Sequence, residues 1–135
     1  MEDYIGMKNT KKLQESGRRF STVFANDPFV MAAWAFENLY QNQNYEAFIM
    51  PEIFDEDGDA VFGRTIFRDD GGIPRIEISA EVPLKPAIEI FAHELAHIAT
   101  PGDSNHGDRW EKAFEQIYQE YIRIGKEVFE DADIV

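Results

Sequence analysis

The sequence predicts an α+β domain, because it contains apolar residues in two different periodicities, separated by prolines, glycines and aspartates. Apolar residues recur at helical spacing over residues 28–41, 85–99 and 108–129. Between the first two of these segments, residues 45–82 carry short strand-like runs divided by turn-forming residues. A chain of 135 residues fits one domain, residues 1–135, which can bury about two-thirds of its unfolded surface.

The first predicted helix, residues 28–41, begins at Asp27 and Pro28. The aspartate can cap the free N–H groups of the first turn, and proline suits the first helical position. The apolar residues that follow form a broad stripe, which predicts packing in the core. Residues 1–19 are polar and partly basic, and we interpret them as a flexible arm, with a docking arm as the alternative. The acidic tail, residues 130–135, is expected to fray.

Three β-strands are predicted, at residues 47–50, 60–67 and 73–79. The segments between them, 55–59 and 69–72, are rich in aspartate and glycine, which tolerate the positive φ angles of tight turns. The simplest arrangement is a three-stranded antiparallel sheet in which consecutive strands are neighbours.

The first of these turns resembles the start of a calcium-binding loop, with Asp55, Asp57 and Asp59 at alternate positions. An EF-hand loop requires glycine at its sixth position and glutamate at its twelfth, and this chain has Ala60 and Ile66 there. The segment is therefore interpreted as a hairpin turn without calcium.

The predicted helix over residues 85–99 has two different faces. The face that carries His93 and His97 points roughly 150° away from an apolar stripe, at about 100° per residue. Residues four apart lie one above the other on a helix, so these two imidazoles can bind one tetrahedral metal ion. Glu94, beside them, can reach a metal-bound water without binding the metal, as in other H-E-x-x-H sites. The apolar stripe consists of Ile88, Phe91, Leu95 and Ile98.

A catalytic zinc site usually has three protein ligands and one water, so a third ligand is expected. His106 follows His97 by nine residues, across a Pro-Gly break that allows the chain to reverse direction. Asp103, Glu111 and Glu115 are the alternatives, but imidazole is the better zinc donor, and we therefore predict His106.

The sequence His93-Glu94-Leu-Ala-His97, followed by His106-Gly-Asp-Arg-Trp110, resembles the SprT-like group of zincin metallopeptidases. In that group a third histidine, usually followed by glycine, opens the last helix. The resemblance covers roughly residues 60–118, counted from the strand-rich segment. It implies a zincin-like minimal metallopeptidase core, although the two ligand segments are closer together here than is usual and no cysteine-rich zinc ribbon is present.

This resemblance implies a zinc-dependent metallopeptidase with one Zn²⁺ ion, Glu94 as general base and a protein or peptide substrate. In zincins an extended substrate pairs with an edge strand beside the cleft. By this resemblance, the segment Ile73 to Ser79 is the candidate here. Pro74, near its start, suggests that this strand has a free side. The residue that stabilises the oxyanion is left open, with three candidates: Arg109, Tyr118 and Tyr121.

The bulk composition limits the classes of partner that we expect this protein to bind. A net charge of −13 disfavours nucleic acid, because an acidic surface repels the phosphate backbone. The chain has no cysteine and no apolar run of the length of a membrane span, so we expect a cytoplasmic protein with no membrane partner. The composition does not indicate an oligomeric state. The alternative function is a catalytically silent zincin-fold module that binds proteins and keeps a structural or vestigial metal site.

Overall fold

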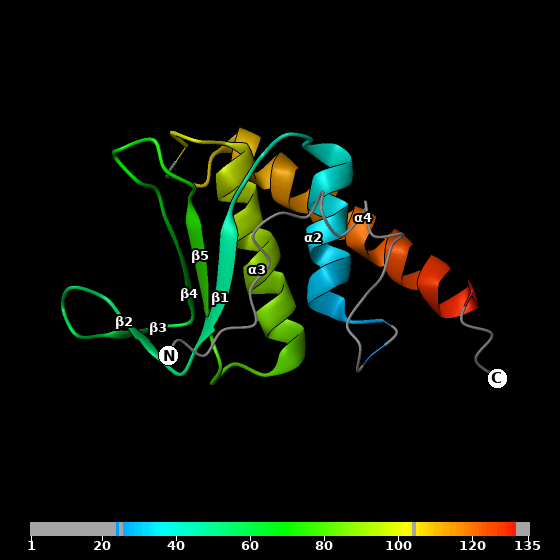
Figure 1. The fold of residues 1–135 in the computed structure, drawn as a ribbon, viewed down its shortest axis with the longest axis horizontal. Coiled ribbons are helices and arrows are strands. Elements are labelled where there is room, and N and C mark those ends of the chain that lie inside the picture. The colour runs from blue at the N-terminus through cyan, green and yellow to red at the C-terminus, as the bar shows by residue number, and fades with distance from the viewer. Residues whose placement is uncertain (1–23, 25, 104, 132–135) are drawn as a thin grey trace.

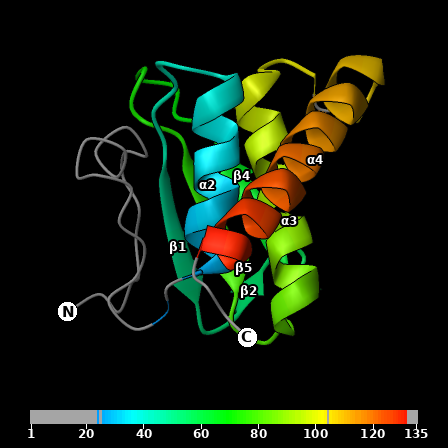
Figure 2. The same ribbon diagram turned by 90° about the vertical axis from the view of Figure 1, so that its right-hand side faces the viewer.

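The computed structural model describes residues 24, 26–103 and 105–131, and it shows a mixed α+β fold (Figure 1). A small sheet lies on one side of the molecule and the helices lie on the other. The long helix α4 crosses in front of α2 and α3, with the sheet behind them (Figure 2). The predicted arm, residues 1–19, lies outside the described residues, as does the end of the predicted tail, 132–135.

Helix α2, Pro28–Leu39, begins where the sequence predicts, and Asp27 is its N-cap. The carboxylate oxygen Oδ1 of Asp27 accepts hydrogen bonds from the backbone N–H groups of Phe29 (2.9 Å) and Val30 (3.3 Å). The helix is buried on almost every side, as expected for a helix that is apolar around its whole circumference.

The main sheet has the strand order β1-β5-β4, with β1 at Glu46–Met50, β5 at Arg75–Ser79 and β4 at Gly63–Ile66. Strand β1 runs parallel to β5, whereas β4 runs antiparallel to β5. A separate two-stranded hairpin, formed by β2 (Ile53–Phe54) and β3 (Ala60–Val61), projects from one end of the sheet (Figure 1).

The predicted three-stranded antiparallel sheet is therefore wrong in its strand order. Strand β5 lies between β1 and β4, so one of the two pairs of neighbouring strands, β1 with β5, is parallel. Strand β5 is central and has no free side, although Pro74 directly precedes it. The alternation of charged and apolar residues in β5 suggests a half-exposed strand. However, Glu77 is buried, because Arg64 and Arg75 pair with its two carboxylate oxygens at 2.7 and 2.8 Å. Strand β5 is therefore buried on both faces, whereas a strand with one solvated face alternates buried and exposed residues.

Both predicted turns are present. Gly58 (φ +84°) lies in the turn between β2 and β3, and Gly71 (φ +77°) in the turn between β4 and β5. Asp55 accepts hydrogen bonds at its Oδ1 from the backbone N–H groups of Asp57 and Asp59, both at 2.9 Å, which agrees with the hairpin-turn interpretation. The strand predicted over residues 60–67 is divided into β3 and β4.

Helices α3, Leu84–Ala99, and α4, Asp108–Asp131, lie close to their predicted ranges. The apolar stripe predicted for α3 is buried, and Phe91 packs at its centre against Tyr45, with ring centroids 6.3 Å apart. Tyr45 also makes an edge contact with Phe36 of α2, at 5.7 Å. These contacts place the core between the sheet and the helices. None of the helices in the described part of the chain has the length and apolar character required to cross a bilayer.

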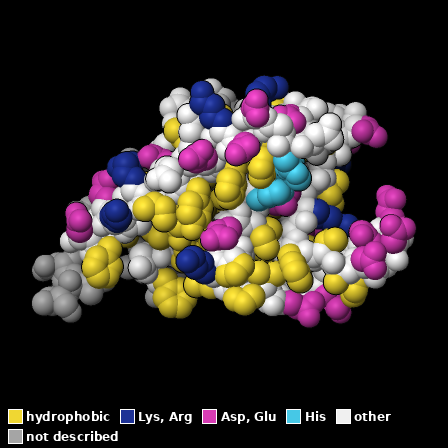
Figure 3. All heavy atoms as spheres, turned by 180° about the vertical axis from the view of Figure 1, so that it is seen from behind, with side chains coloured by type: hydrophobic (Ala, Val, Ile, Leu, Met, Phe, Trp, Pro, Cys, Tyr) yellow, Lys and Arg dark blue, Asp and Glu magenta, His cyan; other side chains and the backbone are white. Residues whose placement is uncertain are grey.

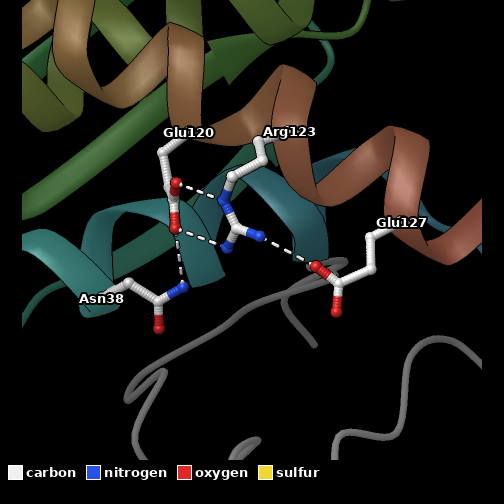
Figure 4. Close-up of polar contacts among 4 residues, drawn as sticks. All are labelled: Asn38, Glu120, Arg123 and Glu127. Atoms are coloured by element: carbon white, nitrogen blue, oxygen red, sulfur yellow. Dashed lines mark hydrogen bonds and ion pairs between the residues drawn. The ribbon is translucent and has the colours of Figure 1, made fainter.

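Polar contacts between exposed side chains also join α4 to α2 (Figure 4). Arg123 donates two hydrogen bonds to the carboxylate of Glu120, at 2.7 and 2.9 Å, and a third to Glu127 at 2.8 Å. Asn38, at the end of α2, donates to the same Glu120 at 3.1 Å. Exposed pairs of this kind contribute at most about 1 kcal/mol each, so α4 is held mainly by its apolar face.

Candidate metal centre

The structure brings together the three histidines that the sequence singles out. His93 and His97 lie one turn apart on α3, with ring centroids 5.0 Å apart, and the ring of His106 lies 4.8 Å from each of them. One ligand nitrogen from each ring lies within 4.8 Å of the others. The Nε2 atoms of His97 and His106 are 3.0 Å apart, close to the roughly 3.3 Å between two nitrogens bound to one tetrahedral zinc ion. The three imidazoles therefore fit a single metal ion.

The loop after α3 carries His106 back over the end of that helix. Helix α3 ends at Ala99, and the carbonyl of its C-cap residue, Thr100, accepts a hydrogen bond from the backbone N–H of Asp103 at 3.1 Å. Gly102 adopts a φ of +89°, and the Asp103 carboxylate accepts a hydrogen bond from the N–H of Gly107 at 3.3 Å. His106 itself has a φ of +54°, a conformation that non-glycine residues adopt infrequently. The loop thus holds His106 in an unfavourable backbone conformation at the point where its ring meets the other two.

The other candidates for the third ligand do not join this group. Among the described residues, Asp103, Glu111 and Glu115 supply no atom to the histidine cluster. Asp103 is nevertheless near, since its negative charge acts to raise the pKa of His97. A set of imidazole donors suits zinc, copper, iron and nickel, so the geometry indicates a metal site without identifying the metal.

The environment of His93 and His97 favours the neutral form of their rings, which is the form that binds a metal. Burial, together with the charges that His97 and His106 would carry, lowers the pKa of His93 to about 4. Burial also lowers the pKa of His97, with His106 as a further cause. Metals bind only the neutral imidazole, so protons compete little with a metal at these two residues near pH 7.

Glu94 lies beside the histidines and is 6% exposed. Its Oε1 accepts a hydrogen bond of 2.7 Å from the hydroxyl of Thr65, and its Oε2 lies 4.0 Å from Nε2 of His93. Burial raises the pKa of Glu94, and the hydrogen bond from Thr65 partly opposes this effect. One oxygen of the carboxylate therefore lies beside the histidine cluster, while the other accepts a hydrogen bond from β4.

Trp110 supports the cluster from the first turn of α4. Its ring centroid lies 4.6 Å from that of His93, 5.6 Å from that of His97 and 4.5 Å from that of His106. Its indole N–H donates to the backbone carbonyl of His93 at 3.2 Å. The sequence places Trp110 in the predicted helix over residues 108–129 and in the family resemblance, but it does not predict this contact with all three rings. Its position four residues after His106 is the only sequence signal for that role.

The cluster forms part of the floor of an open cleft of about 760 Å³. Figure 3 shows the histidine side chains gathered in one group on a face with many hydrophobic side chains. One wall is β4 with the residue after it, and the other is the loop that follows α3. The lining residues from these walls are Gly63, Arg64, Thr65, Phe67, Thr100, Pro101, Gly102 and Asp103. Among the described residues, the three oxyanion candidates Arg109, Tyr118 and Tyr121 do not line the cleft.

The strand beside the cleft is β4, Gly63–Ile66, and not the predicted segment Ile73 to Ser79. The prediction is wrong because β5 lies in the middle of the sheet, between β1 and β4. Sequence reasoning also missed Thr65, whose contact with Glu94 joins residues 29 positions apart. No local pattern carries that information, because it depends on how the strand is placed against α3.

Comparison of the chain with protein-family models, curated proteins and solved structures found no match. The similarity of the segment from His93 to Trp110 to SprT-like zincins therefore remains a prediction from the motif.

Proposed function

We propose that this protein is a zinc-dependent metallopeptidase that cleaves internal peptide bonds of protein or peptide substrates. The observation that carries the proposal is the convergence of three imidazoles on one point, with the carboxylate of Glu94 beside them in an open cleft. Three protein ligands leave a tetrahedral zinc ion one position for water or substrate, which is typical of catalytic rather than structural sites.

A zinc ion bound by His93, His97 and His106 would polarise a peptide carbonyl and lower the pKa of water to about 7. Glu94 would accept the proton of the attacking water and return it to the leaving amine. The raised pKa of Glu94 supports this role, because a general base works best when its pKa approaches the working pH. The low exposure of the carboxylate also limits competition from bulk water.

Among the described residues, β4 pairs only with β5, and its other edge, the free edge, is the surface on which an extended substrate would lie. In an antiparallel pair, alternate residues direct their backbone groups toward the partner strand and away from it. The carbonyl of Phe62 accepts a hydrogen bond from the N–H of Ser79 at 2.9 Å, so Phe62 faces β5. By alternation, Gly63 and Thr65 direct their backbone N–H and C=O groups outward, along the cleft. An unfolded segment could form main-chain hydrogen bonds there, as in β-augmentation.

The test is to measure zinc content and casein cleavage on the same preparation, with and without a chelator. We expect one zinc per chain and cleavage that the chelator abolishes and added zinc restores. Glu94→Gln should keep the zinc and lose about 10²–10⁴-fold in rate, because the amide cannot accept the proton. His97→Ala should lose both zinc and activity.

Two results would contradict the proposal. A zinc-loaded protein that binds casein without cleaving it would favour the protein-binding module instead. Cleavage at an unchanged rate by Glu94→Gln would remove Glu94 from the reaction and with it the general-base mechanism.

A further inference from the structure

We infer that Thr65 is a positioning residue for Glu94, an inference that rests on the proposed peptidase function. Thr65 lies on β4, and its hydroxyl donates a hydrogen bond to Oε1 of Glu94 at 2.7 Å. The same hydroxyl lies 3.4 Å from the backbone carbonyl of Glu94. The strand thus contacts both the side chain and the backbone of the residue that would act as general base.

The hydrogen bond distinguishes the two carboxylate oxygens. Thr65 holds Oε1, while Oε2 lies 4.0 Å from Nε2 of His93, on the side of the metal ligands. A terminal carboxylate torsion is broad and roughly two-fold, so an unheld carboxylate would sample many orientations. A donor on one oxygen restricts this rotation and leaves the other oxygen directed at the reacting centre.

The neighbouring residue Gly63 makes room for this arrangement. A Cβ atom added at Gly63 would overlap Cγ2 of Ile90 and lie 3.5 Å from Oε2 of Glu94. Both inward-facing residues of β4 therefore approach Glu94, one with a hydroxyl and the other with an absent side chain. This close approach brings the strand within hydrogen-bonding distance of the carboxylate.

Thr65 connects the base to the proposed substrate edge. Its side chain holds Glu94, whereas its backbone N–H and C=O point along the free edge of β4. A peptide that pairs with this edge would be aligned by the same residue that orients the base. The distance between the scissile carbonyl and Oε2 would then depend on one short, rigid connection. Loss of the hydroxyl should disturb the alignment more than the binding, and should lower kcat more than it changes KM.

If Thr65 had only a structural role, the loss of its hydroxyl would have a different effect. In that case the hydroxyl only satisfies a buried carboxylate, and its removal would lower stability without a specific loss of kcat. Thr65→Val separates the two roles, because valine has nearly the same shape and lacks the hydroxyl. Thr65→Ser keeps the hydroxyl, and Ile66→Val changes the same strand at a residue that does not line the cleft.

With zinc bound, Thr65→Val should lower kcat on casein-derived peptides about 10- to 100-fold, with KM changed by no more than about two- to threefold. Thr65→Ser should recover most of the rate, and Ile66→Val should match the unmodified protein. The zinc content of all three variants should be unchanged. Loss of zinc in Thr65→Val, or an unchanged kcat in an otherwise active protein, would overturn this inference and leave the peptidase proposal standing.

A second readout needs neither metal nor activity. In the metal-free protein, Thr65→Val should lower the melting temperature, but it should have a smaller effect when Glu94 is also replaced by leucine. Additive shifts in such a double-mutant cycle would mean that the two side chains do not interact, and would overturn the inference. If the zinc-loaded, unmodified protein fails to cleave casein, the proposed function and the role of Thr65 both fall, whatever the cycle shows.

Discussion

Replacement of His106 with glycine should have different effects on the metal-free and the zinc-loaded protein. His106 has a φ of +54°, and a left-handed conformation costs an ordinary residue about 1–2 kcal/mol. Glycine adopts this conformation freely but adds about 0.4–1 kcal/mol of conformational entropy to the unfolded chain. The metal-free variant should therefore be as stable as the unmodified protein, or more stable by about 1 kcal/mol.

With zinc bound, the unmodified protein should instead be more stable than His106→Gly. At a zinc concentration of 100 times its Kd, the unmodified protein gains about 2.7 kcal/mol in its free energy of unfolding. A site with two histidines in place of three is weaker, and at a 100-fold higher Kd the same zinc concentration adds only about 0.4 kcal/mol. The zinc-dependent part of the stability should therefore fall by about 2 kcal/mol.

The assay is urea unfolding of both proteins with a chelator and with zinc in excess. Asn42→Gly provides a matched control, because Asn42 has a similar φ of +68° but does not belong to the histidine cluster. This control should show the same small change without metal and the full response to zinc. An equal zinc response in His106→Gly and the unmodified protein would refute the assignment of His106 as a ligand.

Three further outcomes follow from the geometry. Gly63→Ala should destabilise the protein by about 1–3 kcal/mol, seen as a lower urea midpoint, because the new methyl group overlaps Ile90. Trp110→Phe removes the hydrogen bond to the backbone of His93 and should weaken zinc binding about 10- to 100-fold, measured by competition with a chelator. An unchanged zinc affinity would count against the role of Trp110 in supporting the histidine cluster. The pKa of His93 is about 4 in the folded protein and near 6.5 in the unfolded chain. Between these two pH values the unfolded chain binds more protons than the folded protein. The free energy of unfolding should therefore fall as the pH drops from 6.5 to 4. This slope is best measured in metal-free Glu94→Gln, because the raised pKa of Glu94 acts in the opposite direction, and a flat profile there would contradict the burial of His93.

The local features of this protein could be predicted from its sequence, because each depends on residues close together in the chain. Asp27 and Pro28 determine the start of α2 through a cap and a fixed φ. The spacing of His93 and His97 places both rings on one face of α3, opposite the apolar stripe. The position of His106 after a Pro-Gly break is consistent with its return to that face. The grouping of the three histidines is present in the structure, whereas zinc and peptidase activity remain predictions.

The strand order and the surroundings of Glu94 were decided only by the tertiary structure. The sequence of β5 alternates like an exposed strand, but Arg64 and Arg75 neutralise Glu77 and allow β5 to lie in the centre of the sheet. That arrangement moves the free edge to β4, and it brings Thr65 onto the carboxylate of Glu94 from 29 residues away. Strand periodicity specifies which residues share a face, but not which strand becomes the neighbour. The choice depends on burying charged and apolar groups across the whole sheet at once, and no single segment of the chain contains that information.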